Sequence, residues 1–170
     1  MPYSAKVFDS KVQEFVKANK LKKILDVGAG AGKYWDLLNG DGVTLDAIEP
    51  YSAYVGQFNL PSKYENIFQE KAVTFMIRNW GKSYEYDAVI LGDVLEHMRK
   101  SDGLDFINAI AYHTKYIIAV FPTNYLQDMV QDNILETHVS RWGMTDFDNF
   151  EMVENEIKDG IQIIIAKGLL

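Results

Sequence analysis

Three glycines in five residues, Gly28, Gly30 and Gly32, separate a short apolar run from a helix-like segment that ends at Leu38. Glycine loses more conformational freedom on folding than any other residue, so such a run is expected where the backbone needs unusual torsions or approaches a ligand closely. A buried strand is predicted just before the glycines by the run "KKILDV". The order is therefore strand, tight turn and helix, with the turn available to a ligand.

The rest of the chain repeats this alternation. Strands are predicted from "VTLDAIE", weakly from "ENIFQE", and from "YDAVILGD" and "YIIAVF", which are apolar over consecutive residues, as strands of a buried parallel sheet are. Helices are predicted over 5–19, 52–60 (with Ser52 as its N-cap), 72–80 and 103–113. Asp-Gly in "KDG", between "NFEMVENEI" and "GIQIIIAKG", predicts a closing hairpin. We expect an α/β fold with a doubly wound, mostly parallel seven-stranded sheet and a C-terminal antiparallel hairpin.

Composition narrows the class of protein. A length of 170 residues suits a single domain, residues 1–170. Acidic residues outnumber basic ones by 24 to 17, which disfavours nucleic acid as a partner because phosphate contacts need Lys/Arg-rich faces. The chain has no cysteine, no apolar signal core at its N-terminus and no apolar run of about 18 residues. We therefore expect no disulfide, no contact with a membrane and a cytoplasmic location.

The spacing of the glycine turn excludes two common ligand motifs. A P-loop needs a glycine where Val27 stands and a Ser or Thr where Tyr34 stands. A dinucleotide fingerprint needs its third glycine at Lys33. Glu49 ends the second predicted strand, 21 positions after Gly28, where a carboxylate can accept hydrogen bonds from a ribose diol; the alternative is a solvated carboxylate at a strand end. Together these features indicate an adenosine-bearing ligand without a pyrophosphate.

Three stretches carry a resemblance to a known family. "ILDVGAGAGKY", "LDAIEPY" and "YDAVILGDVLEHM" resemble the first, second and fourth motifs of class I S-adenosylmethionine-dependent methyltransferases. The resemblance runs from about Leu21 to Gly168 and implies the Rossmann-like methyltransferase fold, S-adenosylmethionine as cofactor and S-adenosylhomocysteine as product. The stretch 122–147 is similar to a segment that some members carry after the fifth strand, with Glu136, His138 and Trp142 at matching places.

The resemblance implies a set of cofactor-binding residues. Asp26 would steady the turn or meet the ligand's amino group, and Glu49 would take the ribose hydroxyls. Asp93 would face the methionine end. Glu70 lies near where the family often has an acidic residue beside the adenine, although a surface carboxylate is the equal alternative for this poorly matching stretch. The full set is Asp26, Gly28, Gly30, Gly32, Glu49, Glu70 and Asp93.

Histidines supply the candidates for a base. A hydroxyl or protonated amine acceptor must lose a proton during methyl transfer, which a histidine can accept. His138 is the preferred candidate and His97 the second, because both stand in segments expected at the carboxyl ends of the strands, whereas His113 is expected to interact with the dipole at a helix end. The two candidates could in principle bind a metal with Glu96 and Glu136, but no tight spacing such as HExxH occurs, so no metal is expected.

The sequence thus predicts a methyltransferase that acts on an O- or N-nucleophile of a small molecule. Its fourth motif lacks the Asn/Asp-Pro-Pro-aromatic pattern of enzymes that methylate exocyclic amines of DNA bases or glutamine. The long connection over 122–147 is expected to close over the acceptor, unless Trp142 and Phe147 merely pack it onto the sheet. Two alternatives stay open: a catalytically silent module that binds S-adenosylmethionine or S-adenosylhomocysteine as partner or sensor, and an NAD-dependent oxidoreductase, which Lys33 weakens.

Overall fold

The computed structural model describes residues 5–40, 42–79, 81–82, 84–130 and 132–170. Within these residues seven strands form one sheet, in the order β3-β2-β1-β4-β5-β7-β6. All neighbouring strands are parallel except β7, which runs antiparallel to β5 and β6. The strands are β1 (Lys23–Val27), β2 (Thr44–Ile48), β3 (Ile67–Phe68), β4 (Tyr86–Gly92), β5 (Thr114–Pro122), β6 (Met152–Lys158) and β7 (Ile161–Lys167). This is the predicted sheet with its closing hairpin.

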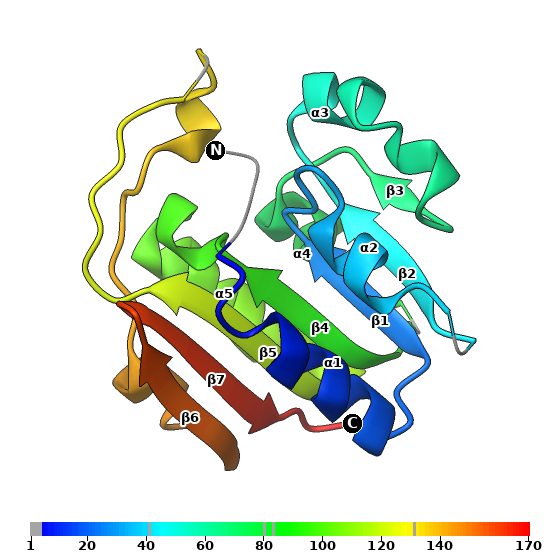
Figure 1. Cartoon of the computed structure of the whole chain (residues 1–170), viewed down its shortest axis with the longest axis vertical. Helices are drawn as coiled ribbons and strands as arrows, with labels where there is room; N and C mark the ends of the chain where they lie inside the picture. The colour runs from blue at the N-terminus through cyan, green and yellow to red at the C-terminus, as the bar shows by residue number, and fades with distance from the viewer. Residues whose placement is uncertain (1–4, 41, 80, 83, 131) are drawn as a thin grey trace.

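Helices cover both faces of the sheet, which gives three layers (Figure 1). One face carries α1 (Asp9–Ala18), α2 (Lys33–Leu38) and α3 (Ser52–Gln57), and the other carries α4 (Ala72–Asn79) and α5 (Lys100–Ile110). Along β4, Ala88 and Ile90 pack into the first apolar cluster, while Val89 and Leu91 pack into the second. The consecutive apolar residues of this strand are explained by burial on both faces.

Short 3-10 helices interrupt the loops, and several lie close to the site described below. They are η1 (Leu60–Ser62), η2 (Leu95–His97), η3 (Ala111–His113), η4 (Ile134–Glu136) and η5 (Met144–Phe147). In the part of the chain that the structure describes, no helix combines the length and the apolar character needed to cross a bilayer.

Some local predictions were wrong. Tyr51, not Ser52, occupies the N-cap position of α3, because its N–H is drawn to the Glu49 carboxylate and its backbone stays extended. The third strand is only two residues long. His113 ends η3 directly after α5, as expected of a residue at a helix end, and it makes contacts that the sequence did not predict: its Nδ1 lies 3.1 Å from the Tyr84 carbonyl oxygen, and its ring stacks on Tyr84 with centroids 4.1 Å apart.

The winding of the sheet reverses between β1 and β4, its central pair. From β1 the chain proceeds outward through β2 and β3, and from β4 it proceeds the other way through β5. The register pairs Val27 with both Ile48 and Leu91, so the carboxyl ends of three strands stand level. In open α/β sheets, ligands bind outside the carboxyl ends at such a reversal.

Candidate functional site

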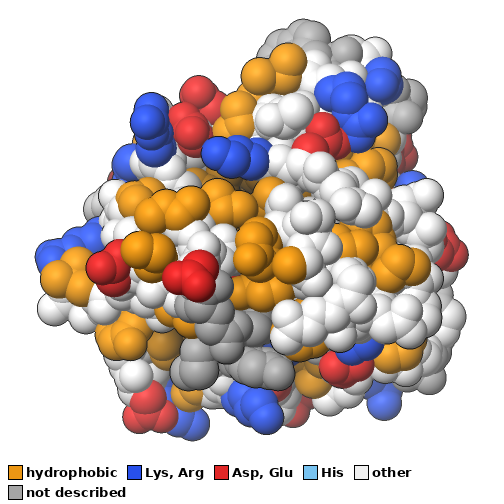
Figure 2. Space-filling view, turned by 90° about the horizontal axis from the view of Figure 1, so that it is seen from above, with side chains coloured by type: hydrophobic (Ala, Val, Ile, Leu, Met, Phe, Trp, Pro, Cys, Tyr) orange, Lys and Arg blue, Asp and Glu red, His pale blue; other side chains and the backbone are white. Residues whose placement is uncertain are grey.

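A cavity of about 1070 Å³ opens at this reversal. Its walls come from the glycine turn after β1, the residues that follow β2 and β4, the start of α4 and the segment 122–139. Figure 2 looks onto the upper side of Figure 1, where hydrophobic side chains gather near the middle of the face, with acidic and basic side chains among and around them. A mixed apolar and polar lining of this size is typical of a small-molecule site.

The glycine turn has the torsions that its composition predicts. Gly28, Gly30 and Gly32 all have left-handed torsions, with φ of 72°, 53° and 83°. The Gly28 N–H donates to the Ile48 carbonyl oxygen at 2.8 Å, which ties the turn to the end of β2. Gly28 and Gly30 line the cavity, whereas Gly32 caps α2, and a Cβ there would lie 2.9 Å from Lys63 Cδ. The first two glycines therefore face a ligand, and the third shapes the turn.

Glu49 lies at the end of β2 and is buried rather than solvated. Its Oε2 accepts the Gly30 N–H and its Oε1 accepts the Tyr51 N–H, both at 2.8 Å. Burial raises the pKa of this carboxyl, and the two backbone N–H groups oppose the shift. Glu49 lines the cavity beside the glycine turn. The structure thus brings together the two features that the sequence singled out for an adenosine-bearing ligand.

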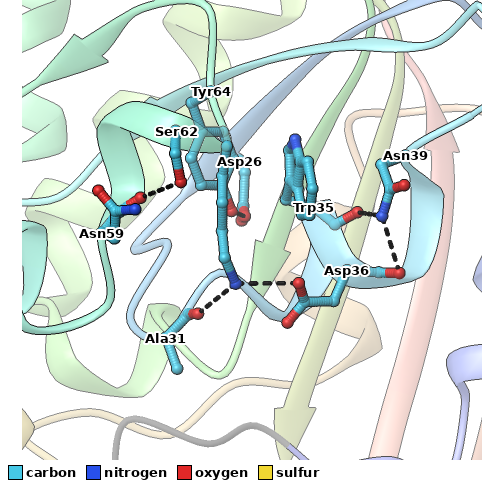
Figure 3. A network of polar contacts seen from close by, with 9 residues as sticks. Asp26, Ala31, Trp35, Asp36, Asn39, Asn59, Ser62 and Tyr64 are labelled. Atoms are coloured by element: carbon cyan, nitrogen blue, oxygen red, sulfur yellow. Dashed lines mark hydrogen bonds and ion pairs between the residues drawn. The ribbon is translucent and has the colours of Figure 1, made fainter.

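Asp26 does not line the cavity. The Tyr64 hydroxyl donates to its Oδ2 at 2.6 Å, and Figure 3 shows this pair beside the loop of Ala31. Burial raises the pKa of Asp26 to about 7, against the opposing effect of the Tyr64 hydrogen bond. Near it, Lys63 Nζ donates to the Ala31 carbonyl oxygen at 3.2 Å and to Asp36 at 2.9 Å. Of the two roles considered for Asp26, this geometry favours steadying the turn.

The other two acidic candidates differ in position. Asp93 follows β4 with a left-handed φ of 50° and lines the cavity. Its Oδ2 accepts the Ala5 N–H at 3.1 Å. Glu70 forms an ion pair with Arg78 and does not line the cavity.

Both candidate bases lie on the cavity wall and meet there. The rings of His97 and His138 lie 4.7 Å apart between centroids, at an interplanar angle of 77°. Burial lowers the pKa of His97, and the neighbouring His138 lowers it further.

Next to the two histidines, Glu96 is 2% exposed, and neither of its carboxylate oxygens has a hydrogen-bond partner among the described residues. Burial raises the pKa of Glu96 well above its usual range, and the charge of Asp93 adds to the shift.

The segment 122–147 divides into two parts. Several of its residues between Pro122 and Val139 line the cavity, and the buried Glu136 accepts a hydrogen bond from the Tyr54 hydroxyl of α3 at 3.0 Å. The second part packs: Trp142 Nε1 donates to the Leu95 carbonyl oxygen at 2.8 Å, and Phe147 is fully buried. The packing alternative therefore holds for Trp142 and Phe147.

Sequence reasoning missed several residues of this site. Tyr54 lies 82 positions before Glu136, and no local pattern links the two. Glu96 was noticed only as a metal ligand in principle, since nothing in "DVLEHM" indicates that its side chain is buried. Gly92 could have been singled out from the sequence, because it ends a buried strand. In the structure, the Tyr34 ring fills the space that a side chain at this position would need.

The fold with this cavity defines the structural class: it is the fold of S-adenosylmethionine-dependent methyltransferases. A magnesium protoporphyrin IX methyltransferase from Synechocystis PCC 6803 with bound S-adenosylhomocysteine is 15% identical, with a TM-score of 0.69 over 95% of this chain and 82% of that one. A methyltransferase of Clostridium acetobutylicum ATCC 824 is 11% identical, with a TM-score of 0.69 over 97% and 92%. A 16S rRNA methylase is 18% identical, with a TM-score of 0.57 over 96% and 88%.

No protein-family model and no curated protein sequence matches the chain. At the identities of the similar structures, the likeness establishes the fold alone. The fold that the sequence resemblance implied is confirmed.

Proposed function

We propose that this protein is a methyltransferase that transfers the methyl group of S-adenosylmethionine to an O- or N-nucleophile of a small molecule. The observation that carries the proposal is the meeting of Gly28, Gly30 and Glu49 on one cavity wall, with the Glu49 carboxylate held by the Gly30 N–H. A carboxylate fixed beside a glycine turn suits a ribose diol next to a closely approaching chain. Asp93, on the same wall, is suited to the methionine end.

The charge of the cavity supports a cationic cofactor over NAD or ATP. Among the described residues, six acidic side chains line it, against the two basic side chains of Lys71 and Arg99. Like charges in a partly desolvated cleft repel, so polyphosphate ligands are disfavoured there. S-adenosylmethionine carries a sulfonium cation and an ammonium group, which the acidic lining attracts.

The proposed acceptor site lies between η2 and the segment 122–139. His97 and His138 stand there, ready to receive a proton from a hydroxyl or an ammonium acceptor. An activated sulfonium needs mainly an in-line nucleophile at short distance, so positioning and proton removal are the tasks left to the protein. The acidic lining of the cavity favours a small molecule over a nucleic acid, whose phosphates need basic contacts.

The cofactor assignment is tested by calorimetry with S-adenosylhomocysteine and with its analogue that lacks a ribose hydroxyl. The parent should bind the complete ligand more tightly, by about tenfold or more, because a hydrogen bond to a charged group is worth about 1.5–3 kcal/mol. Glu49→Gln should lose most of this discrimination, while Glu70→Gln, outside the cavity, serves as the matched control and should keep it. Equal discrimination in the parent and Glu49→Gln, or tighter binding of NAD or ATP, would overturn the assignment.

Catalysis is tested separately by the release of S-adenosylhomocysteine with a panel of hydroxyl- and amine-bearing small molecules. His138→Ala should slow turnover and leave cofactor affinity nearly intact, because it acts on the acceptor side. Cofactor binding without turnover on any acceptor would support the silent-module alternative instead.

A further inference from the structure

We propose that Glu96, His97 and His138 form a binding site for one divalent transition-metal ion, of the class represented by Zn²⁺ and Mn²⁺, on the wall of the cavity. One ligand atom from each of the three side chains lies within 4.8 Å of the other two. All three residues line the cavity, so an ion could reach them. No metal was expected because the sequence has no tight ligand spacing such as HExxH, whereas the fold brings His138 next to Glu96 and His97.

The spacing is close to that of a bound ion. Ligand atoms about 2.0–2.2 Å from a metal lie roughly 3 to 3.5 Å from one another. The three atoms must therefore approach by at most about 1.8 Å from their present separation of no more than 4.8 Å. A change of this size is of the order that side-chain torsions can supply.

Both histidines are already in the tautomer that a metal requires. His97 Nδ1 lies 3.3 Å from the Thr137 carbonyl oxygen, and His138 Nδ1 lies 2.9 Å from that of Tyr125. A carbonyl oxygen only accepts, so each Nδ1 carries the hydrogen, and each Nε2 keeps its lone pair. Metal-bound histidines are commonly oriented in this way, with the second nitrogen donating to a backbone carbonyl.

Glu96 gives an independent indication of a ligand. Its carboxylate is buried in the cavity wall, and neither oxygen has a hydrogen-bond partner among residues 5–40, 42–79, 81–82, 84–130 and 132–170. A buried polar group without a partner is costly, so such groups are rare in native structures unless an ion or a water completes them. A cation between Glu96 and the two imidazoles would compensate the carboxylate directly.

The donor set decides the class of ion. Two imidazoles and one carboxylate suit Zn²⁺, Mn²⁺ or Fe²⁺, whereas Mg²⁺ and Ca²⁺ prefer oxygen ligands alone. Asp93 and Glu136 lie close enough for their charges to act on Glu96, so the surroundings of the site are negative and favour a cation. Three protein ligands leave further coordination positions open to the cavity.

In the proposed methyl transfer, on which this point depends, a bound ion restricts the kind of acceptor molecule that the enzyme can methylate. While the ion is bound, the Nε2 atoms of His97 and His138 are its ligands and do not act as bases; the ion instead polarises an acceptor oxygen that coordinates it, and the proton of that oxygen is lost to solvent. The acceptor would then be a molecule with an oxygen placed to complete the coordination, and a hydroxyl oxygen is the expected nucleophile.

Metal binding can be measured without any acceptor or cofactor. Untagged, metal-free protein is titrated with Zn²⁺ against a chromophoric chelator, with Mn²⁺ and Mg²⁺ by calorimetry, and with Co²⁺ while its visible absorption is followed. We expect one equivalent of Zn²⁺ and of Mn²⁺, weaker Mg²⁺ binding, and Co²⁺ bands of a nitrogen and oxygen ligand set. Glu96→Gln and His138→Gln should each weaken Zn²⁺ binding at least tenfold, which is about 1.4 kcal/mol.

The control is His113→Gln, which replaces the third histidine of the chain, away from the cavity. It should bind Zn²⁺ like the parent. Urea unfolding without metal verifies that each variant folds; Glu96→Gln should be at least as stable as the parent because it removes a buried ionisable group. The proposed metal site would be refuted if the parent showed no saturable Zn²⁺ binding, or if His113→Gln lost as much Zn²⁺ affinity as Glu96→Gln and His138→Gln. S-adenosylhomocysteine affinity, measured in parallel, reports separately on the proposed function.

Discussion

Replacing Gly28 by alanine tests the contact between the two central loops of the sheet. Gly28 has a φ of +72°, and a Cβ there would lie 2.7 Å from Val94 Cγ2 and 3.1 Å from Val94 Cβ. Two separate penalties therefore act on the variant. The first is backbone strain, since an L-residue rarely adopts this torsion, and the second is a collision with a side chain that comes from the loop after β4.

The structure gives the size of each penalty. The left-handed torsion costs alanine about 1–2 kcal/mol. Forcing a methyl group into an occupied space costs typically about 1–3 kcal/mol. Gly28→Ala should therefore lose about 2–5 kcal/mol, a large share of the roughly 5–15 kcal/mol that stabilises an ordinary domain.

Gly42→Ala measures the cost of backbone strain alone, without a collision. Its φ of +73° matches that of Gly28, but the nearest atom to its Cβ would be Lys22 Nζ at 3.7 Å, an ordinary contact. This variant should lose only about 1–2 kcal/mol. Adding Val94→Ala to Gly28→Ala makes room for the methyl group, so the double variant should be more stable than the two separate losses predict.

Urea unfolding measures the parent, the three single variants and the double variant, with the slope m used to verify that the unfolded states are comparable. Equal losses in Gly28→Ala and Gly42→Ala would refute the collision. The collision would also be refuted if the losses of stability in Gly28→Ala and Val94→Ala added up to the loss in the double variant. Such a result would show that the two loops relax independently.

Three further predictions address other parts of the fold. Since burial raises the pKa of Asp26 to about 7, the native state keeps a proton that the unfolded chain loses from about pH 4. The Asp26 contribution to stability should fall by at most about 4 kcal/mol as the pH rises to about 7, and Asp26→Asn should flatten the measured profile; an unchanged slope would contradict this. Trp142→Phe removes the Nε1 hydrogen bond to the Leu95 carbonyl oxygen, which keeps the Ser140 hydroxyl and the Met98 N–H as donors, and should cost about 0.5–1.5 kcal/mol in thermal unfolding without changing cofactor affinity; a matching loss of affinity would contradict a packing role. Tyr54→Phe removes the bond to Glu136, about 1 kcal/mol, and should speed amide exchange over 133–138 several-fold; unchanged exchange would show that other contacts hold the segment.

The sequence by itself determined the layered α/β fold, because the signals for it are local. Burial on both faces requires a continuous apolar run, and β4 and β5 carry one. The Asp-Gly turn at Asp159 and Gly160 is a signal of adjacent residues, and both have the positive φ that such a turn needs. The glycine turn and Glu49 could be assigned for the same reason, since each depends on its place at the end of a strand.

Only the tertiary structure decided which of the candidate side chains meet. The ring of His138 reaches His97 across 41 positions, because the segment after β5 folds back over the end of β4. Asp26 was expected at the ligand or the turn, and the Tyr64 hydroxyl from another loop decided its surroundings. Burial of Glu96 without a hydrogen-bond partner in the described part of the chain is likewise a property of the packed molecule. The pattern of apolar residues along a strand indicates which of its faces are buried. Contacts between loops instead depend on how the whole chain folds, and no periodic pattern in the sequence indicates them.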